Sequence, residues 1–140
     1  MTWLVWALLS AVFAAATAIL AKIGISGIDS NLATAIRTTV VLVFTWAIAI
    51  GLDKHGALTT IGRRSWLFLV LSGLCTGLSW LCYFRALSLG PASAVAPIDK
   101  LSVVLVMVLA WLFLGERIGP MQAAGGGLIA AGAILIALAR

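Results

Sequence analysis

The sequence predicts an all-α, polytopic membrane protein with five transmembrane helices. Of its 140 residues, 64% are hydrophobic and only 9% are charged, whereas a soluble domain carries roughly 25% charged residues. Five apolar runs of 19 to 22 residues divide the chain, and about 20 such residues cross a bilayer as a helix. None of the runs alternates apolar and polar residues as barrel strands do, so all five are expected to be helical. This composition excludes a conventional soluble enzyme.

The predicted helices are residues 3–21, 32–50, 66–84, 93–114 and 120–138. Gly, Asp, Ser and Asn residues separate the first two, and Ser30 or Asn31 is expected to cap the second helix. The longest connection, residues 51–65, precedes the third helix. Gly90 and Pro91 interrupt the chain before the fourth helix, and Pro120 suits the first turn of the fifth. Residues 1–140 are therefore predicted to form a single membrane domain.

Basic residues are divided evenly between the two ends of the helices. We call the side of the N-terminus side A and the opposite side B. Side A receives Lys54, Arg63, Arg64 and Arg117, side B receives Lys22, Arg37, Arg85 and Arg140, and Lys100 lies within the fourth helix. The positive-inside rule orients a chain by an excess of Lys and Arg on one side. The balance predicts that the chain inserts in both orientations, or that other signals orient it.

No cofactor and no metal site are expected. Cys75 and Cys82 share one apolar run and are interpreted as small residues of a membrane helix. His55 is the one histidine, and only four carboxylates accompany it, so the sequence contains no nucleophile–base pair and an enzyme is the least favoured class. The net charge of +5 is spread over helix ends without a basic face, so nucleic acid is not an expected partner.

The chain from Tyr83 onward carries a distinctive set of motifs. They are Ala86-Leu87 before Gly90, then Pro91-Ala92-Ser93, Pro97, Leu114-Gly115-Glu116-Arg117, and a glycine-rich last helix. This set resembles the repeat of the EamA family, in the drug/metabolite transporter superfamily, and the resemblance extends over the whole chain. It implies a secondary transporter, because members commonly contain ten helices in two five-helix repeats of inverted topology. This sequence matches one repeat.

The odd number of helices predicts the assembly. A single five-helix chain can rebuild the inverted arrangement only with an oppositely oriented partner, and such transporters bind substrate at the repeat interface. We expect an antiparallel homodimer in the plasma membrane or bacterial inner membrane, like those of the related small multidrug-resistance proteins. A heterodimer with a second five-helix chain is the alternative. The expected function is export of a drug or metabolite by alternating access; the alternative is a non-transporting subunit or half-transporter.

Three charged residues lie inside the apolar runs, where charge is costly and indicates function. Arg37 and Asp99 are expected at similar depths from side B, about 8 and 9 Å at 1.5 Å per residue. They are therefore predicted to pair, as a substrate or coupling site or as a structural ion pair. Lys100 points about 100° away from Asp99 on a helix and is not expected to be its partner. Arg37 and Lys100 can also snorkel to the side B interface.

Three further residues near side B complete the predicted site. Pro97 removes a backbone donor from the fourth helix, which predicts either a hinge or a kink that serves packing. Trp80 and Tyr83 are three residues apart in the third run. They are predicted to line an aromatic pocket for a hydrophobic or cationic ligand, although the interfacial belt is the favoured position for Tyr83.

The charge of the substrate is left open by these residues. If Arg37 and Lys100 line the pathway, the site is net positive even with Asp99 and favours anions. If Asp99 acts with Trp80, a cation becomes the expected substrate.

Small residues predict close helix contacts, within the chain or between chains. They are Gly73-x-x-x-Gly77 in the third run and Ala123-x-x-x-Gly127-x-x-x-Ala131 in the fifth. In lipid, such faces let backbones approach and pack.

Overall fold

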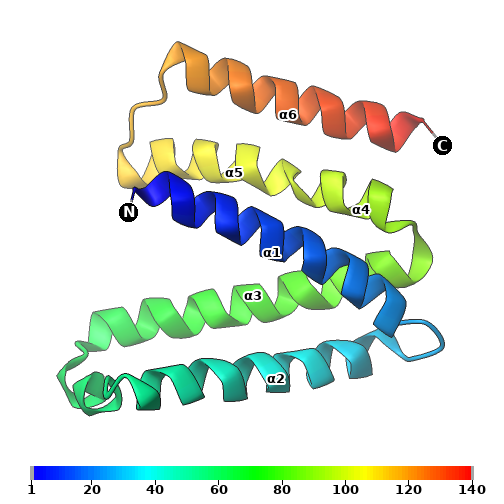
Figure 1. Ribbon diagram of the computed structural model, residues 1–140. Helices are drawn as coiled ribbons and strands as arrows, with labels where there is room; N and C mark the ends of the chain where they lie inside the picture. The colour runs from blue at the N-terminus through cyan, green and yellow to red at the C-terminus, as the bar shows by residue number, and fades with distance from the viewer. Residues whose placement is uncertain (1, 140) are drawn as a thin grey trace. The chain divides into compact units, whose positions relative to one another are not determined.

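The computed structural model describes residues 2–139 and is helical throughout its long segments (Figure 1). The helices are α1 (Trp3–Gly24), α2 (Ser30–Gly51), the 3₁₀ helix η1 (His55–Thr60), α3 (Arg63–Leu89), α4 (Ala92–Asp99), α5 (Leu101–Leu109), the π-helical turn η2 (Ala110–Leu114) and α6 (Pro120–Leu138). Five segments are long and apolar enough to cross a membrane, with α4, α5 and η2 forming one of them. The predicted all-α membrane fold is confirmed. Met1 and Arg140, which was assigned to side B, lie outside the described residues.

The chain forms two compact units. The α4–α6 unit comprises Met1–Ile19 and Leu89–Arg140, and the α2–α3 unit comprises Leu20–Ser88. Each unit is treated separately below, and a single domain over residues 1–140 stays a prediction.

Several helices extend beyond the apolar runs that predicted them. α3 has 27 residues and begins at Arg63, because a helix continues into the headgroup region after its apolar stretch ends. α2 is capped by Asp29, whose side chain accepts hydrogen bonds from the backbone N–H groups of Asn31 (2.9 Å) and Leu32 (3.1 Å). The prediction of Ser30 or Asn31 as the cap was wrong. Asp, Ser and Asn cap helices about equally well, so their order in the sequence could not select among them.

In the α4–α6 unit, α6 packs along α4 and α5 (Figure 1). Gly126 makes this approach possible, since a Cβ there would lie only 3.0 Å from Sδ of Met107 on α5. Ala133, two turns along the same face, is also buried. The predicted small-residue seam through Gly127 is exposed instead. Within this unit the contact therefore runs one position earlier along α6 than the sequence spacing indicated.

In the α2–α3 unit, α2 and α3 run in opposite directions and are joined through η1 (Figure 1). The buried side chains of this unit are Ile25, Ser30, Thr34, Phe84 and Leu87. The Thr34 hydroxyl donates to the Ser30 carbonyl at 2.8 Å, so this buried polar group is satisfied within its own helix. These residues all lie near the side B ends of their helices, and they support the region in which the candidate site is found.

The contact between Gly126 and Met107 makes a testable prediction. A Gly126→Leu substitution should destabilise the protein by about 1–3 kcal/mol, because overpacking forces neighbouring side chains apart. Gly127→Leu is the matched control, since no atom lies within 4 Å of a Cβ there. Thermal unfolding of both variants in lipid nanodiscs measures the difference. Equal unfolding temperatures would contradict the packing of α6 against α5.

Candidate functional site

The guanidinium of Arg37 on α2 lies over aromatic rings of α3. Its Cζ atom is 4.3 Å from the ring centroid of Trp80 and 5.5 Å from that of Phe84. Trp80 and Phe84 are four residues apart, so they share one face of the helix. Such a cation–π contact contributes about 2 kcal/mol when it is desolvated. The structure thus brings together two of the predicted site residues, Arg37 and Trp80.

Phe84 belongs to this cluster although the sequence analysis did not select it. The signal that could have found it is its spacing from Trp80, one helical turn along α3. Phe84 is almost fully buried, and the ring of Tyr83 meets it edge-on with centroids 6.5 Å apart. Tyr83 therefore lies beside the cluster, and its role in binding stays a prediction.

Lys22 places a second cation at the same face of α3. Its Nζ donates a 2.6 Å hydrogen bond to the carbonyl of Leu87, which follows Phe84 by three residues. A cation near the C-terminal end of a helix is favoured by the helix dipole. The sequence analysis treated Lys22 as a helix-end flank, since nothing in its spacing indicated a partner 65 residues away.

Arg37 has no carboxylate partner among the described residues of the α2–α3 unit. The two acidic residues of that unit are Asp29, which caps α2, and Asp53, which follows the opposite end of α2. The predicted partner, Asp99, belongs to the other unit, so the Arg37–Asp99 pair stays a prediction. Because α2 begins at Ser30, Arg37 lies about 10 Å along its helix, deeper than the sequence analysis placed it.

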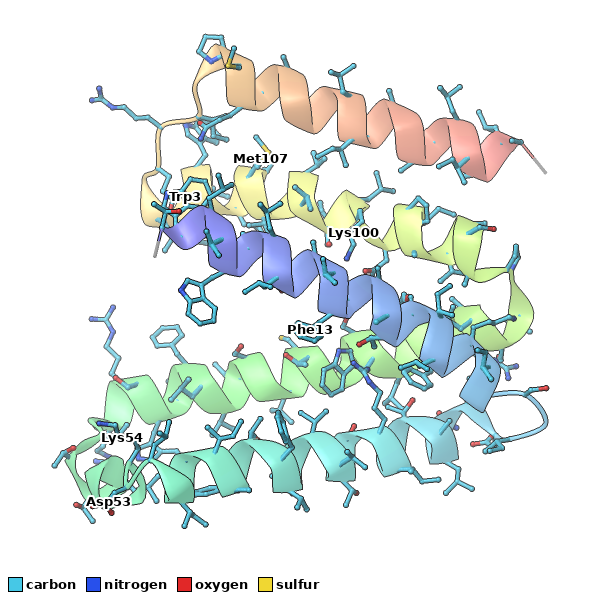
Figure 2. The ribbon with its side chains drawn as sticks, viewed as in Figure 1. Trp3, Phe13, Asp53, Lys54, Lys100 and Met107 are labelled. Carbon is cyan, nitrogen blue, oxygen red and sulfur yellow. The ribbon has the colours of Figure 1, made fainter. Side chains whose placement is uncertain are left out.

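The fourth membrane-spanning segment is broken near its middle. α4 ends at Asp99 and α5 begins at Leu101, with Lys100 between them (Figure 2). The Lys100 amide donates to the Pro97 carbonyl at 3.1 Å, and the Val103 amide donates to the Lys100 carbonyl at 3.0 Å. Both are the tighter i→i−3 bonds of a 3₁₀ turn. The prediction of one continuous helix over residues 93–114 was therefore wrong, because Pro97 cannot supply the N–H that the regular pattern needs.

Asp99 and Lys100 form an ion pair at this break. The Lys100 Nζ lies 3.5 Å from Oδ2 of Asp99, and both side chains are partly exposed. The prediction that these neighbours are not partners was wrong. It assumed the 100° step of a regular helix, whereas the helix is interrupted here and the long lysine side chain reaches back. Within the α4–α6 unit, the negative charge of Asp99 is thus offset by its neighbour.

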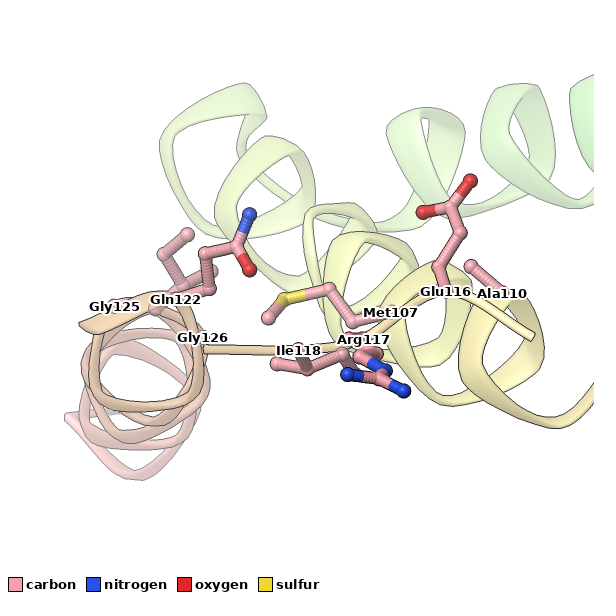
Figure 3. Close-up of a pocket in the computed structure, with 9 residues that line it drawn as sticks. Met107, Ala110, Glu116, Arg117, Ile118, Gln122, Gly125 and Gly126 are labelled. Atoms are coloured by element: carbon pink, nitrogen blue, oxygen red, sulfur yellow. The ribbon is translucent and has the colours of Figure 1, made fainter. Parts of the chain in front are cut away.

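A cavity of about 320 Å³ lies between the end of the fourth span and the start of α6 (Figure 3). It is lined by Met107, Ala110, Glu116, Arg117, Ile118, Gln122, Gly125, Gly126 and Ile129. Figure 3 shows the side chains of Glu116 and Arg117 pointing apart. Gln122 accepts a 2.9 Å hydrogen bond from the Gly119 amide and so caps α6. None of the predicted substrate-binding residues lines this cavity, and its polar side chains serve the connection between two helices.

Metal and thiol chemistry find no support among residues 2–139. No group of three His, Cys, Asp or Glu side chains in that part of the chain could hold a metal ion. Cys75 and Cys82 are exposed thiols. The arrangement of charged and aromatic side chains inside five apolar helices is instead typical of proteins that bind and move small molecules across membranes.

Comparison with known proteins identifies the family. The EamA-like transporter family matches residues 1–138. A Sinorhizobium protein, described as an uncharacterized transporter in the cobO 3′ region, is 53% identical over 137 residues, which cover 98% of this chain and 97% of the relative. No solved structure matches. The chain is thus a multi-pass membrane transporter. It belongs to the EamA-like transporter family, as the motifs from Tyr83 onward indicated.

The broken span makes a testable prediction. A Pro97→Ala substitution should restore a backbone donor and close the break, because proline in a helix interior destabilises it by about 3 kcal/mol. Amide hydrogen–deuterium exchange of residues 98–103 in nanodiscs should slow at least tenfold. Pro120→Ala is the control, since proline at the first position of α6 replaces no needed donor. Unchanged exchange in the Pro97 variant would show that the break has another cause.

Proposed function

We propose that this protein is a secondary transporter that exports a small drug-like or metabolic molecule by alternating access, working as an antiparallel homodimer. The observation that carries the proposal is the interrupted fourth span, with Pro97, Asp99 and Lys100 at its break. Inverted-repeat transporters bind their substrates near mid-membrane at discontinuous helices. Lys100 lies about 12 Å along a span that begins at Ala92, which is close to that depth.

The break supplies a physical basis for movement. The 3₁₀ turn around Lys100 separates α4 and α5 into two segments whose backbones are each internally bonded. Changing the angle between such segments alters the few bonds at the turn and leaves the rest intact. Pro97 is the hinge residue in this proposal, and Arg37, Asp99, Lys100, Trp80 and Tyr83 are the substrate or coupling residues.

Two features support the antiparallel homodimer. Basic residues are divided equally between the two sides of the membrane, so no excess of positive charge orients the chain. The Sinorhizobium relative, 97% of which is covered by the match, also corresponds to one five-helix repeat. In this family's common form the second, inverted repeat would complete the pathway, and here an inverted second copy takes its place.

Orientation is the first test. Single cysteines would replace Thr59 and Ser26, which are exposed on opposite sides, in a chain lacking Cys75 and Cys82. An impermeant thiol reagent applied to whole cells should label about half of the molecules at each site. Labelling at one site only would contradict dual topology and would point to a different, oppositely oriented partner chain.

Charge-biased variants test the pairing directly. Thr59→Arg with Gly62→Arg adds positive charge to side A, and Ser26→Arg with Ser88→Arg adds it to side B, each at exposed positions. Each variant should adopt a single orientation. A tagged side A variant should then copurify with the side B variant and not with a second side A copy. Copurification of like with like would contradict the antiparallel dimer.

Transport itself is tested without a known substrate. Proteoliposomes would be loaded with the small-molecule fraction of a cell extract, and mass spectrometry would follow which compounds leave. The unmodified protein should release at least one compound about tenfold faster than liposomes containing the Pro97→Ala variant. Release at the rate of empty liposomes would favour a non-transporting subunit or half-transporter.

A further inference from the structure

We propose that the transported molecule carries a carboxylate or phosphate group, and that Arg37 binds this group from the aromatic face formed by Trp80 and Phe84. The proposal rests on the transport function above and names the class of its substrate. It follows from the charge balance inside the spans, the state of the Arg37 donors and the occupancy of the Trp80 ring.

The charges inside the spans do not cancel within their units. Asp99 and Lys100 lie 3.5 Å apart and offset one another in the α4–α6 unit. Arg37 has no carboxylate among the described residues of its own unit, so its charge is left over. An uncompensated charge inside a membrane span is costly and is retained where it serves binding. A substrate with one negative group supplies the compensation.

The donors of Arg37 are available for such a group. A guanidinium offers five N–H donors, and aromatic rings that attract it through their faces consume none of them as conventional hydrogen bonds. Among the described residues, no buried side-chain nitrogen or oxygen lacks a hydrogen-bond partner, so the nitrogens of Arg37 are accessible rather than enclosed. A fixed, planar fork of donors matches carboxylate and phosphate oxygens in pairs.

The same contacts argue against a cationic substrate. Arg37 already covers a face of Trp80 at 4.3 Å, the surface on which a cationic ligand would have to stack. Lys22, bonded to the Leu87 carbonyl on the same face of α3, adds a second positive charge. An approaching cation therefore meets repulsion, whereas an anion is attracted by both groups.

Trp80 provides a local reporter of binding. In a variant with Phe at the other five tryptophan positions, Trp80 would be the sole source of indole fluorescence; those positions are Trp3, Trp6, Trp46, Trp66 and Trp111. The protein would be placed in phosphatidylcholine nanodiscs and titrated with inorganic phosphate, succinate or benzoate. Binding at Arg37 alters its stacking on the ring, so at least one of these anions should change the fluorescence saturably.

Three substitutions at two positions test the role of the guanidinium. Arg37→Gln should raise the apparent dissociation constant at least tenfold, and Arg37→Lys should raise it less, because the charge remains while the paired donors are lost. Arg85→Gln is the matched control: it removes an exposed arginine next to Phe84 on α3 and should change binding less than twofold. Thermal unfolding of each variant confirms that it is folded.

Four outcomes overturn the proposal. They are an equal response in folded Arg37→Gln, a response to tetraethylammonium alone, no response to any of the three anions, and a response only when phosphatidylglycerol replaces phosphatidylcholine. The last would identify a lipid headgroup, not a substrate, as the anion at Arg37. Failure of transport with Arg37-dependent anion binding intact would refute the transport function and leave the site standing. Transport with no Arg37-dependent binding would do the reverse.

Discussion

The lack of water inside the bilayer is the constraint on which the rest of the structure depends. Every backbone polar group there must be bonded within the chain, which makes helices of all five spans. Side-chain hydroxyls obey the same rule: Thr34, Thr38, Thr39 and Thr76 each donate to the carbonyl four residues earlier. Against this background, a broken helix and an uncompensated guanidinium are the features that call for a functional explanation.

The two charged sites meet this constraint in different ways. Asp99 and Lys100 neutralise each other at a break where the backbone is already irregular. Arg37 instead rests on rings that attract its charge without removing its donors. The first arrangement is electrically closed and the second is open to a ligand. This difference assigns flexibility to the fourth span and recognition to the face of α3.

The distribution of apolar side chains fits a protein that is completed by its surroundings. Close packing is concentrated where α6 meets α5 at Gly126, whereas most large apolar side chains are exposed. Such surfaces are excluded from water by lipid or by another chain. The even division of basic residues allows an inverted copy to supply part of that cover.

The sequence by itself determined the class of fold, the number of spans and the family, because hydrophobic length and helix-end motifs are local properties. It also selected Arg37, Trp80, Asp99, Lys100 and Pro97, because charge and proline inside apolar runs are visible without a structure. Only the tertiary structure decided that Phe84 and Lys22 join Arg37 and Trp80 at one face of α3. It also decided that Lys100 turns back to Asp99 and that Gly126, not Gly127, faces α5. Those outcomes depend on which helix faces meet and on where a helix departs from regular geometry. Residue spacing along one segment does not contain that information.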